Sequence, residues 1–147
     1  MRVILQRVHQ ASVTVDNEVV GSIDQGLLVF LGCGEGDTKE ELDSIVEKSV
    51  NLRIFSDEDG RMNLSLLDLD AEMLVVSQFT LYANTKKGRR PSFGDAMKPG
   101  PAEVLYENFV DTVRSRGVSV ETGVFGAMMD VELINDGPVT IILDTNE

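Results

Sequence analysis

Alternating apolar and polar residues predict strands near the start of the chain. Residues 12–15 alternate with a period of two, as a half-buried strand does, and the segment 3–15 is predicted to be one strand. Turn residues at 16–17 and 24–26 separate it from two further strands, EVVGSI and LLVFLG. Because LLVFLG is apolar throughout, we expect both faces of that strand to be covered.

Two later segments have the period of a helix. Thr38 and Glu41 have the spacing of a capping box, in which each side chain bonds the other residue's amide, and apolar residues then recur at helical spacing. A second helix is predicted from Pro101, a residue favoured in the first turn, to just before Gly117. The apolar stripe of this second helix comprises Val104, Leu105, Phe109, Val110 and Val113.

The middle of the chain returns to short apolar runs. The segment 53–68 predicts a short strand, an acidic turn and a polar connector. EMLVVSQFTLYA, residues 72–83, predicts a longer strand, and the longest irregular stretch follows at 84–100. That stretch separates the strand from the second helix.

The C-terminal region predicts three more strands, VSVETG, MMDVELI and PVTIIL. Asp136-Gly137 is a strong hairpin signal between the last two. Pro138 follows directly, although proline has no amide donor and is tolerated only at a strand's first residue, an edge or a bulge. With strands at both ends and two helices between them, we expect a layered α/β or α+β fold with a mixed, mostly antiparallel sheet.

Length and composition fit one soluble domain. The chain has 147 residues, near the usual size of a domain. No apolar run reaches ~18 residues, and the opening segment MRVILQRVHQ lacks the pattern of a secretory signal. Cys33 is the sole cysteine, which excludes an internal disulfide. We therefore expect a cytoplasmic protein with no membrane partner.

The low counts of histidine and cysteine limit which catalytic and metal sites the chain can form. With His9 and Cys33 as the single members of their types, no zinc cluster of the C-x-x-C kind can form. A Ser-His-Asp triad would have to use His9, and a Cys-His pair would have to use both residues. His9 is more simply a strand residue and Cys33 a small buried one. No glycine-rich nucleotide-binding fingerprint follows a strand, so we expect neither a metal nor a cofactor.

The charge is unevenly distributed. The net charge of −12 argues against wholesale binding to nucleic acid, including DNA. One segment, KKGRR at 86–90, holds four of the 13 basic residues and no acidic one. A basic island on an acidic chain suggests local contact with a polyanion, and the alternative is a solvated loop.

Polar residues interrupt apolar strands at two places, 77–80 and 135–140. The first, Ser77-Gln78-Phe79-Thr80, follows a run of apolar residues. A core strand rarely ends with three hydrogen-bonding side chains around one aromatic ring unless they are satisfied or face a ligand. The alternatives are a strand emerging at the surface for the first segment and a hairpin with a misplaced proline for the second.

These two segments, SQFTL (77–81) and NDGPVT (135–140), resemble the signature motifs of the D-aminoacyl-tRNA deacylases, also called D-tyrosyl-tRNA deacylases. Further segments resemble the family in order and spacing, so the similarity covers essentially all 147 residues: MRVILQRV, GLLVFLG, LRIFSDEDGRMN, GRRPSF and TGVFGAMMDVELINDGPVT. The resemblance implies one deacylase domain, 1–147, that acts without a cofactor.

The resemblance also implies a homodimer with two active sites at its interface. In each site, SQFTL of one subunit would lie against Gly137 and Pro138 of the other. The bond between Gly137 and Pro138 would be cis, which could aim both carbonyls into the neighbouring pocket. Such a wall would collide with the side chain of an L-residue, admit a D-residue and also admit glycine.

The implied reaction is hydrolysis of the ester that joins an amino acid to the terminal adenosine of tRNA. Ser77, Gln78, Phe79 and Thr80 are the candidate catalytic residues. We expect the amides near Phe79 and Thr80 to bind the oxyanion, Gln78 to orient the ester or adenosine, and the tRNA 2′-hydroxyl to help activate water. A nucleophilic Ser77 or Thr80 is the rival mechanism, although neither has an evident base.

The remaining site residues are expected to bind substrate. Those near the second motif are Asn135, Gly137, Pro138, Val139 and Thr140, with Arg7 bracing them or pairing with an acid on the strand face. Lys86, Lys87, Arg89 and Arg90 are expected to meet tRNA phosphates. The alternative to an enzyme is a non-catalytic homodimeric module that binds small molecules or nucleotides.

Overall fold

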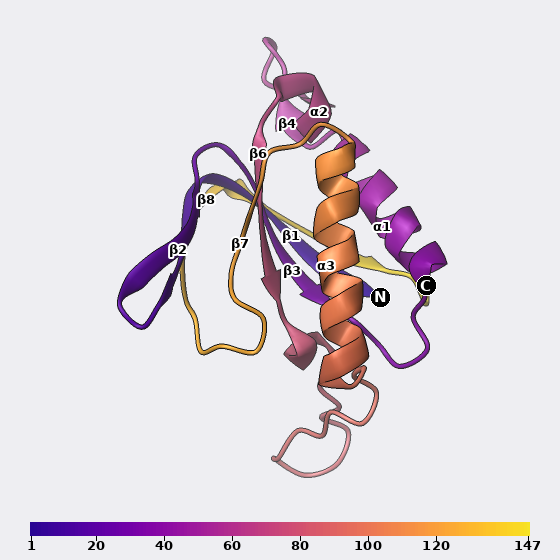
Figure 1. Cartoon of the computed structure of the whole chain (residues 1–147). Helices are drawn as coiled ribbons and strands as arrows, with labels where there is room; N and C mark the ends of the chain where they lie inside the picture. The colour runs from indigo at the N-terminus through magenta and orange to yellow at the C-terminus, as the bar shows by residue number, and fades with distance from the viewer.

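A computed structural model describes residues 1–147, which form a mixed sheet with helices packed on one side (Figure 1). The elements in chain order are β1 (Arg2–Val15), β2 (Glu18–Ile23), β3 (Gly26–Gly32), α1 (Lys39–Asn51), β4 (Phe55–Ser56), β5 (Met62–Leu64), α2 (Leu66–Leu69), β6 (Glu72–Ser77), the 3-10 helix η1 (Phe79–Tyr82), α3 (Pro99–Ser115), β7 (Val120–Thr122) and β8 (Asp130–Asp144). The predicted α/β class is confirmed. None of these helices is long and apolar enough to cross a membrane.

The sheet is organised around β1. β2, β3 and β8 each pair with β1 in the antiparallel direction, β2 along residues 11–15 and β3 along residues 2–8. β6 is parallel to β3 and β7 is parallel to β6. Parallel neighbours need a long crossover, and α3 forms the one between β6 and β7. β8 pairs with β1 alone, so it is an edge strand.

The two faces of the sheet are covered unequally. α1 and α3 pack on one face (Figure 1) over a cluster of 26 buried apolar residues. The opposite face carries a cluster of seven. Leu27 and Val29 of β3 belong to the larger cluster and Leu28 to the smaller one, as expected for a strand covered on both faces.

Both long helices were predicted. The capping box of α1 is confirmed: the Thr38 hydroxyl accepts a hydrogen bond from the Glu40 amide at 3.2 Å, and the Glu41 carboxylate accepts one from the Thr38 amide at 2.7 Å. Hydrogen bonds that the Thr38 hydroxyl and the Thr38 amide donate to the Glu41 carboxylate lower the pKa of Glu41. α3 begins at Pro99 instead of Pro101, and Val104 is 58% exposed, so it lies outside the buried stripe.

The strand predicted to continue to residue 83 ends at Ser77, so this part of the prediction was wrong. Ser77 makes the last pair with Leu31 of β3, and β3 itself ends at Gly32. The chain therefore has no neighbouring strand beyond Ser77, and it coils into η1. The short helix α2, capped by Ser65, was also missed within the predicted polar connector.

The hairpin predicted at Asp136-Gly137 is also wrong, because β8 is one continuous strand on β1. Thr140 pairs with Gln6, and Asn135 pairs with Val8. β8 therefore advances five residues where β1 advances two, and the three extra residues of β8 form a bulge. A type I′ turn needs positive φ at both central residues, and of the two only Gly137 has it, at +136°.

Candidate active site

The first candidate segment is the SQFT turn, residues 77–80, at the carboxyl end of β6. The Gln78 amide donates to the Leu31 carbonyl at 2.8 Å, which fixes the backbone where the strand ends. The side-chain amide of Gln78 donates to the Thr80 hydroxyl. Phe79 is 55% exposed and Thr80 is also exposed. The turn thus presents one aromatic ring and two linked polar side chains at the surface.

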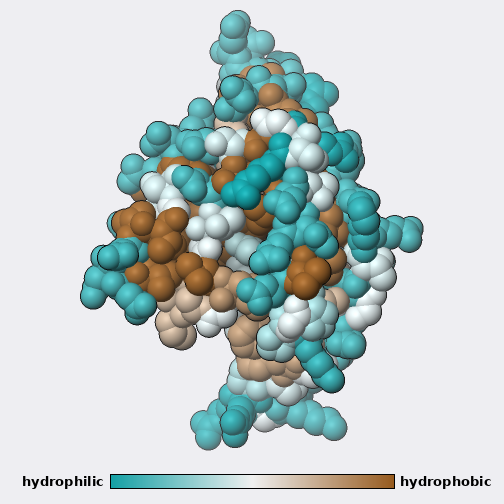
Figure 2. Space-filling view, in the orientation of Figure 1, coloured by the Kyte–Doolittle hydropathy of each residue, from teal (hydrophilic) through white to brown (hydrophobic).

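A basic loop starts beside this turn. The ring of Phe93 packs edge to face against Phe79, with centroids 5.0 Å apart. Asn84 and Ser92 exchange two backbone hydrogen bonds, of 2.8 and 3.0 Å, which close the loop 85–91 at its base. The loop projects at the lower end of Figure 1 and forms the hydrophilic tip in Figure 2. Its four cations, none of which forms a salt bridge, are Lys86, Lys87, Arg89 and Arg90.

The second candidate segment is the Gly-Pro bulge, residues 135–140 of β8. Gly137 and Pro138 are exposed, and the peptide bond between them is cis. Arg7, which is only 7% exposed, donates from Nε to the Asp136 carbonyl at 3.1 Å and from Nη1 to the Ile54 carbonyl at 2.7 Å. Its Nε also lies 3.3 Å from the Asp136 carboxylate. Arg7 thus contacts the bulge and also pairs with an acid, the two roles considered for it.

Side chains close the bulge from within. The Asn135 carbonyl oxygen Oδ1 accepts from the Val139 amide at 3.1 Å. Asn135 Nδ2 donates to Gln6 Oε1 at 2.7 Å, and the Thr140 hydroxyl donates to the same oxygen at 2.7 Å. Gln6 was missed from the sequence, although it precedes Arg7 on β1. A Cβ at Gly137 would lie 2.8 Å from Val139 Cγ2 and 3.2 Å from Arg7 Nη2, so the backbone there has no room for a side chain.

The two segments lie far apart within one chain. Ser77 is in register with Leu31 of β3 and Val3 of β1, whereas the bulge lies opposite Arg7, four residues further along β1. Four residues span roughly 13 Å, and the three strand spacings from β8 to β6 span roughly 14 Å. The separation is therefore about 19 Å, too far for both segments to contact one amino acid.

Within one chain, neither His9 nor Cys33 can act as a base for the SQFT turn. His9 is exposed, with Nε2 3.5 Å from Asp136 Oδ1, and it lies six residues along β1 from Val3, the residue level with Ser77. That is roughly 20 Å along the sheet. Cys33 is buried, and the loss of solvent raises the pKa of its thiol to about 11. No group of three or more His, Cys, Asp or Glu side chains is arranged to hold a metal ion.

Known proteins are similar to this chain over nearly its whole length. The family model described as D-Tyr-tRNA(Tyr) deacylase matches residues 4–144. The chain is 58% identical to the D-aminoacyl-tRNA deacylase of Halothermothrix orenii over 147 residues, which are 100% of this chain and 99% of that protein. It is 61% identical to the D-aminoacyl-tRNA deacylase of Roseiflexus sp. (strain RS-1), with coverage of 99% and 94%.

Two solved structures share the fold. That of a c-Myc DNA unwinding element binding protein has a TM-score of 0.93 at 43% identity, covering 99% of each chain. That of a probable eukaryotic D-amino acid tRNA deacylase has a TM-score of 0.82 at 23% identity, covering 97% of each chain.

Proposed function

The chain belongs to the D-Tyr-tRNA(Tyr) deacylase family, and we propose a two-subunit mechanism by which it recognises its substrate. Its activity is hydrolysis of the ester of D-aminoacyl-tRNA, which releases the D-amino acid and tRNA. In our proposal, the SQFT turn of one subunit and the Gly-Pro bulge of a second subunit form each active site. Because the substrate takes part in translation, we place the enzyme in the cytoplasm.

The separation of the two segments is the observation that carries this proposal. Both are exposed, and about 19 Å divides them within one chain, so a second copy is needed to bring a bulge to each turn. The sheet face without helices is suited to contact with that copy, because residues beside its small core stay partly exposed, among them Phe30 and Leu133. A two-fold axis would then create two identical sites.

The bulge is proposed to reject L-amino acids by collision. If the ester and the α-ammonium are held in place, the side chains of D- and L-residues point in opposite directions. A wall on the side toward which the L-residue's side chain points excludes L-residues only if the wall resists displacement. Arg7 and Asn135 hold the bulge from two sides, which supports that role. Glycine has no side chain to collide, so we propose glycyl-tRNA as a second substrate.

The hydrolytic step needs little beyond positioning, because an aminoacyl ester is already activated. The amides of Phe79 and Thr80 begin η1, where helical backbone donors have no partner within the helix, and we propose them as oxyanion donors. Gln78 is proposed to orient the ester or adenosine, and Phe79 to form a wall of the pocket. The 2′-hydroxyl of tRNA assists the attacking water, while Ser77 lacks a histidine base within its chain.

The basic loop is proposed to bind the acceptor stem. Its four cations have no acidic partner in the chain, and phosphate contacts of this kind position a nucleic acid without reading its sequence. A local cationic segment offsets the overall charge of −12 where tRNA approaches.

The selectivity test uses three substrates: D-tyrosyl-tRNA, L-tyrosyl-tRNA and glycyl-tRNA. We expect the first and third to lose their ester faster with enzyme than without it, and the second to decay at the uncatalysed rate. Equal decay of the two tyrosyl esters without acceleration would overturn the proposal and favour a binding module. A Ser77→Ala variant that retains turnover, with no burst of acyl-enzyme, would exclude a serine nucleophile.

Mixed dimers test whether two subunits share each site. One variant carries Gln78→Ala with Thr80→Ala, and the other carries Gly137→Ala. Each is expected to be nearly inactive alone. After co-refolding in equal amounts, half of the dimers are mixed and each has one intact site, so activity should recover to about a quarter of wild type. No recovery would place each site within one chain.

A further inference from the structure

We infer that a cleft beside the SQFT turn binds the nucleotide that precedes the terminal adenosine of tRNA, with Arg2 binding its phosphate. This inference rests on the proposed function, since it concerns the same substrate. The cleft has a volume of about 390 Å³. Its lining includes Arg2, Tyr82, Asn84, Lys86, Asp95 and Asn146.

The cleft lies between the SQFT turn, which is proposed to hold the ester, and the basic loop, which is proposed to bind tRNA phosphates. Tyr82 is the last residue of η1, which begins at Phe79, and three residues of a 3-10 helix rise about 6 Å. Lys86 is the first cation of the basic loop. A tRNA strand that runs from an ester at the SQFT turn to phosphates at the loop therefore crosses this cleft first. The nucleotide next to the terminal adenosine is the one within reach.

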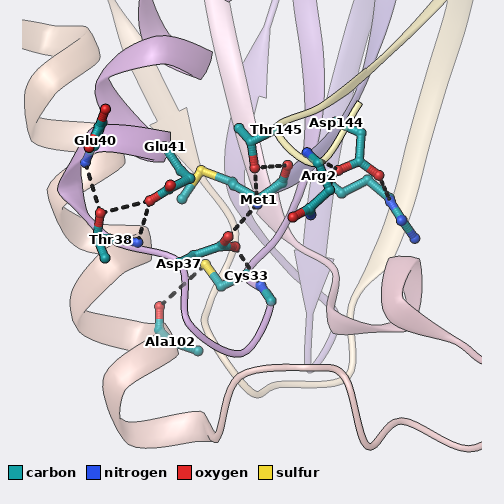
Figure 3. Close-up of polar contacts among 12 residues, drawn as sticks. Met1, Arg2, Cys33, Asp37, Thr38, Glu40, Glu41, Ala102, Asp144 and Thr145 are labelled. Carbon is teal, nitrogen blue, oxygen red and sulfur yellow. Dashed lines mark hydrogen bonds and ion pairs between the residues drawn. The ribbon is translucent and has the colours of Figure 1, made fainter.

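Arg2 is held in a fixed position at the cleft. Its Nε donates to Asp144 Oδ2 at 2.6 Å (Figure 3), its Nη1 donates to the Leu81 carbonyl at 2.7 Å, and its guanidinium lies 4.8 Å from the centroid of the Tyr82 ring. The side chain is still 36% exposed. A guanidinium has five N–H donors, so donors remain beyond these two bonds, and a positioned fork of this kind suits phosphate.

The pairing with Asp144 keeps both groups charged. The hydrogen bond that Arg2 donates to Asp144 is the largest cause that raises the pKa of Arg2. Burial works to raise the pKa of Asp144, but hydrogen bonds from Asn146 and Arg2 lower it overall. Arg2 is therefore a permanent cation that bridges the start of β1 and the end of β8, and its orientation is set before any ligand arrives.

The other lining groups favour a nucleotide over a free phosphate. Asp95 would repel a bare anion, but its carboxylate can accept a hydrogen bond from a ribose hydroxyl or a base amine. The side-chain amides of Asn84 and Asn146 can donate and accept. tRNA ends in CCA, so the nucleotide at this position is a cytidine, whose exocyclic amine is a donor. Cations for the phosphate and acceptors for the base thus occur in one cleft.

A series of substrates of increasing length tests the inference. The D-tyrosyl esters of adenosine, of the dinucleotide cytidylyl-adenosine and of full tRNA are assayed with the full-length enzyme. We expect kcat/KM to rise about tenfold from adenosine to the dinucleotide, because a charge-assisted hydrogen bond is gained. In Arg2→Gln this rise should disappear, while kcat/KM on D-tyrosyl-adenosine stays within about twofold of wild type. A purely structural role of Arg2 would lower both values together.

Two further variants complete the test. Lys86→Ala should lose part of the same rise, and it is expected to fold, because the hydrogen bond from Lys86 to Asn84 uses the backbone amide. Lys48→Ala is the matched control, since Lys48 is an exposed cation in the last turn of α1. That end of α1 lies away from the basic loop (Figure 1). The inference is overturned if wild type gains nothing from the added cytidine, or if Arg2→Gln keeps the gain. Hydrolysis of D-tyrosyl-adenosine tests the proposed function separately.

Discussion

The SQFT turn and the Gly-Pro bulge are held in place by different means. The bulge is tied by side chains from β1, with Arg7 on the Asp136 carbonyl and Gln6 accepting bonds from Asn135 and Thr140. The turn is anchored by backbone hydrogen bonds to β3, and its one side-chain bond, Gln78 to Thr80, lies within the turn itself. The bulge therefore depends on distant residues, whereas the turn is largely self-contained.

This difference matches the tasks proposed for the two segments. A wall that discriminates by collision must resist displacement, so a buried arginine behind it is useful. A group that holds an ester and an adenosine must fit a ligand, which a surface turn with an exposed aromatic ring can do. Substitutions that remove the support of the bulge should reduce selectivity, one that displaces the bulge should reduce the rate as well, and those in the turn should reduce the rate alone.

The largest effect is expected from Arg7→Ala, which breaks the support of the bulge. The change removes a nearly buried cation and leaves the Ile54 and Asp136 carbonyls without their donors. We expect the free energy of unfolding to fall by about 3 kcal/mol in urea titrations. Arg7→Lys is the control, because it keeps the charge and loses the planar fork. A loss below about 1 kcal/mol would contradict the brace.

Gly137→Ala should displace the bulge without removing its supports. Its Cβ would meet Val139 Cγ2 at 2.8 Å and Arg7 Nη2 at 3.2 Å, and φ of +136° is unfavourable for alanine. A displacement of an ångström can reduce a rate about 100-fold, and we expect kcat/KM on D-tyrosyl-tRNA to fall by that order. Gly100→Ala is the control, since a Cβ there meets nothing within 4 Å. Equal rates for the two variants would remove the bulge from the site.

Thr80→Ala probes the turn instead. It removes the hydroxyl that accepts from Gln78, so the Gln78 amide loses its fixed orientation. We expect kcat to fall about tenfold, with stability and the preference for D-residues unchanged. Thr112→Ala is the comparison, at a half-buried threonine whose hydroxyl makes a local hydrogen bond. If Thr80→Ala impaired selectivity more than rate, the division of tasks between turn and bulge would be wrong.

Arg89→Ala should weaken the binding of tRNA and leave the SQFT turn and the Gly-Pro bulge unchanged. Each phosphate contact contributes about one unit to the slope of log affinity against log salt, so we expect that slope, measured as kcat/KM from 50 to 200 mM salt, to fall by about 1. Arg61→Ala, at an exposed arginine in the β4–β5 hairpin, should leave the slope unchanged. A flat salt profile in wild type would argue against the loop as a tRNA contact.

Thr38→Ala is expected to leave both segments unaffected. It removes the cap of α1, which should cost about 1 kcal/mol of stability in thermal or urea unfolding. The ratio of D- to L-tyrosyl-tRNA hydrolysis should stay at the wild-type value. A changed ratio would mean that general stability, rather than the local support of the bulge, determines selectivity.

Local sequence signals predicted much of the fold. The first three strands and the cap of α1 depend on neighbouring residues, and the structure has all of them. The errors arose where a distant partner decides the outcome. β6 ends at Ser77 because β3 ends beside it, and Asp136-Gly137 is not a hairpin because both halves of β8 pair with β1.

The site shows the same limit. The two motifs predicted the segments of the candidate site, but Gln6 is visible only through its register with Thr140. The separation of about 19 Å between the segments follows from strand order, which a single sequence does not contain. The cleft at Arg2 likewise joins the start of β1, the end of β8 and the loop after η1, so no local pattern reveals it.

The bulge has a further consequence for the outer edge of β8. An uninterrupted 15-residue edge strand would offer a long row of unpaired backbone groups on which foreign chains could align and aggregate. Pro138 provides no donor, and the three extra residues break the regular spacing midway. The interruption divides the edge into two short pieces, a common way for soluble proteins to prevent fibril growth.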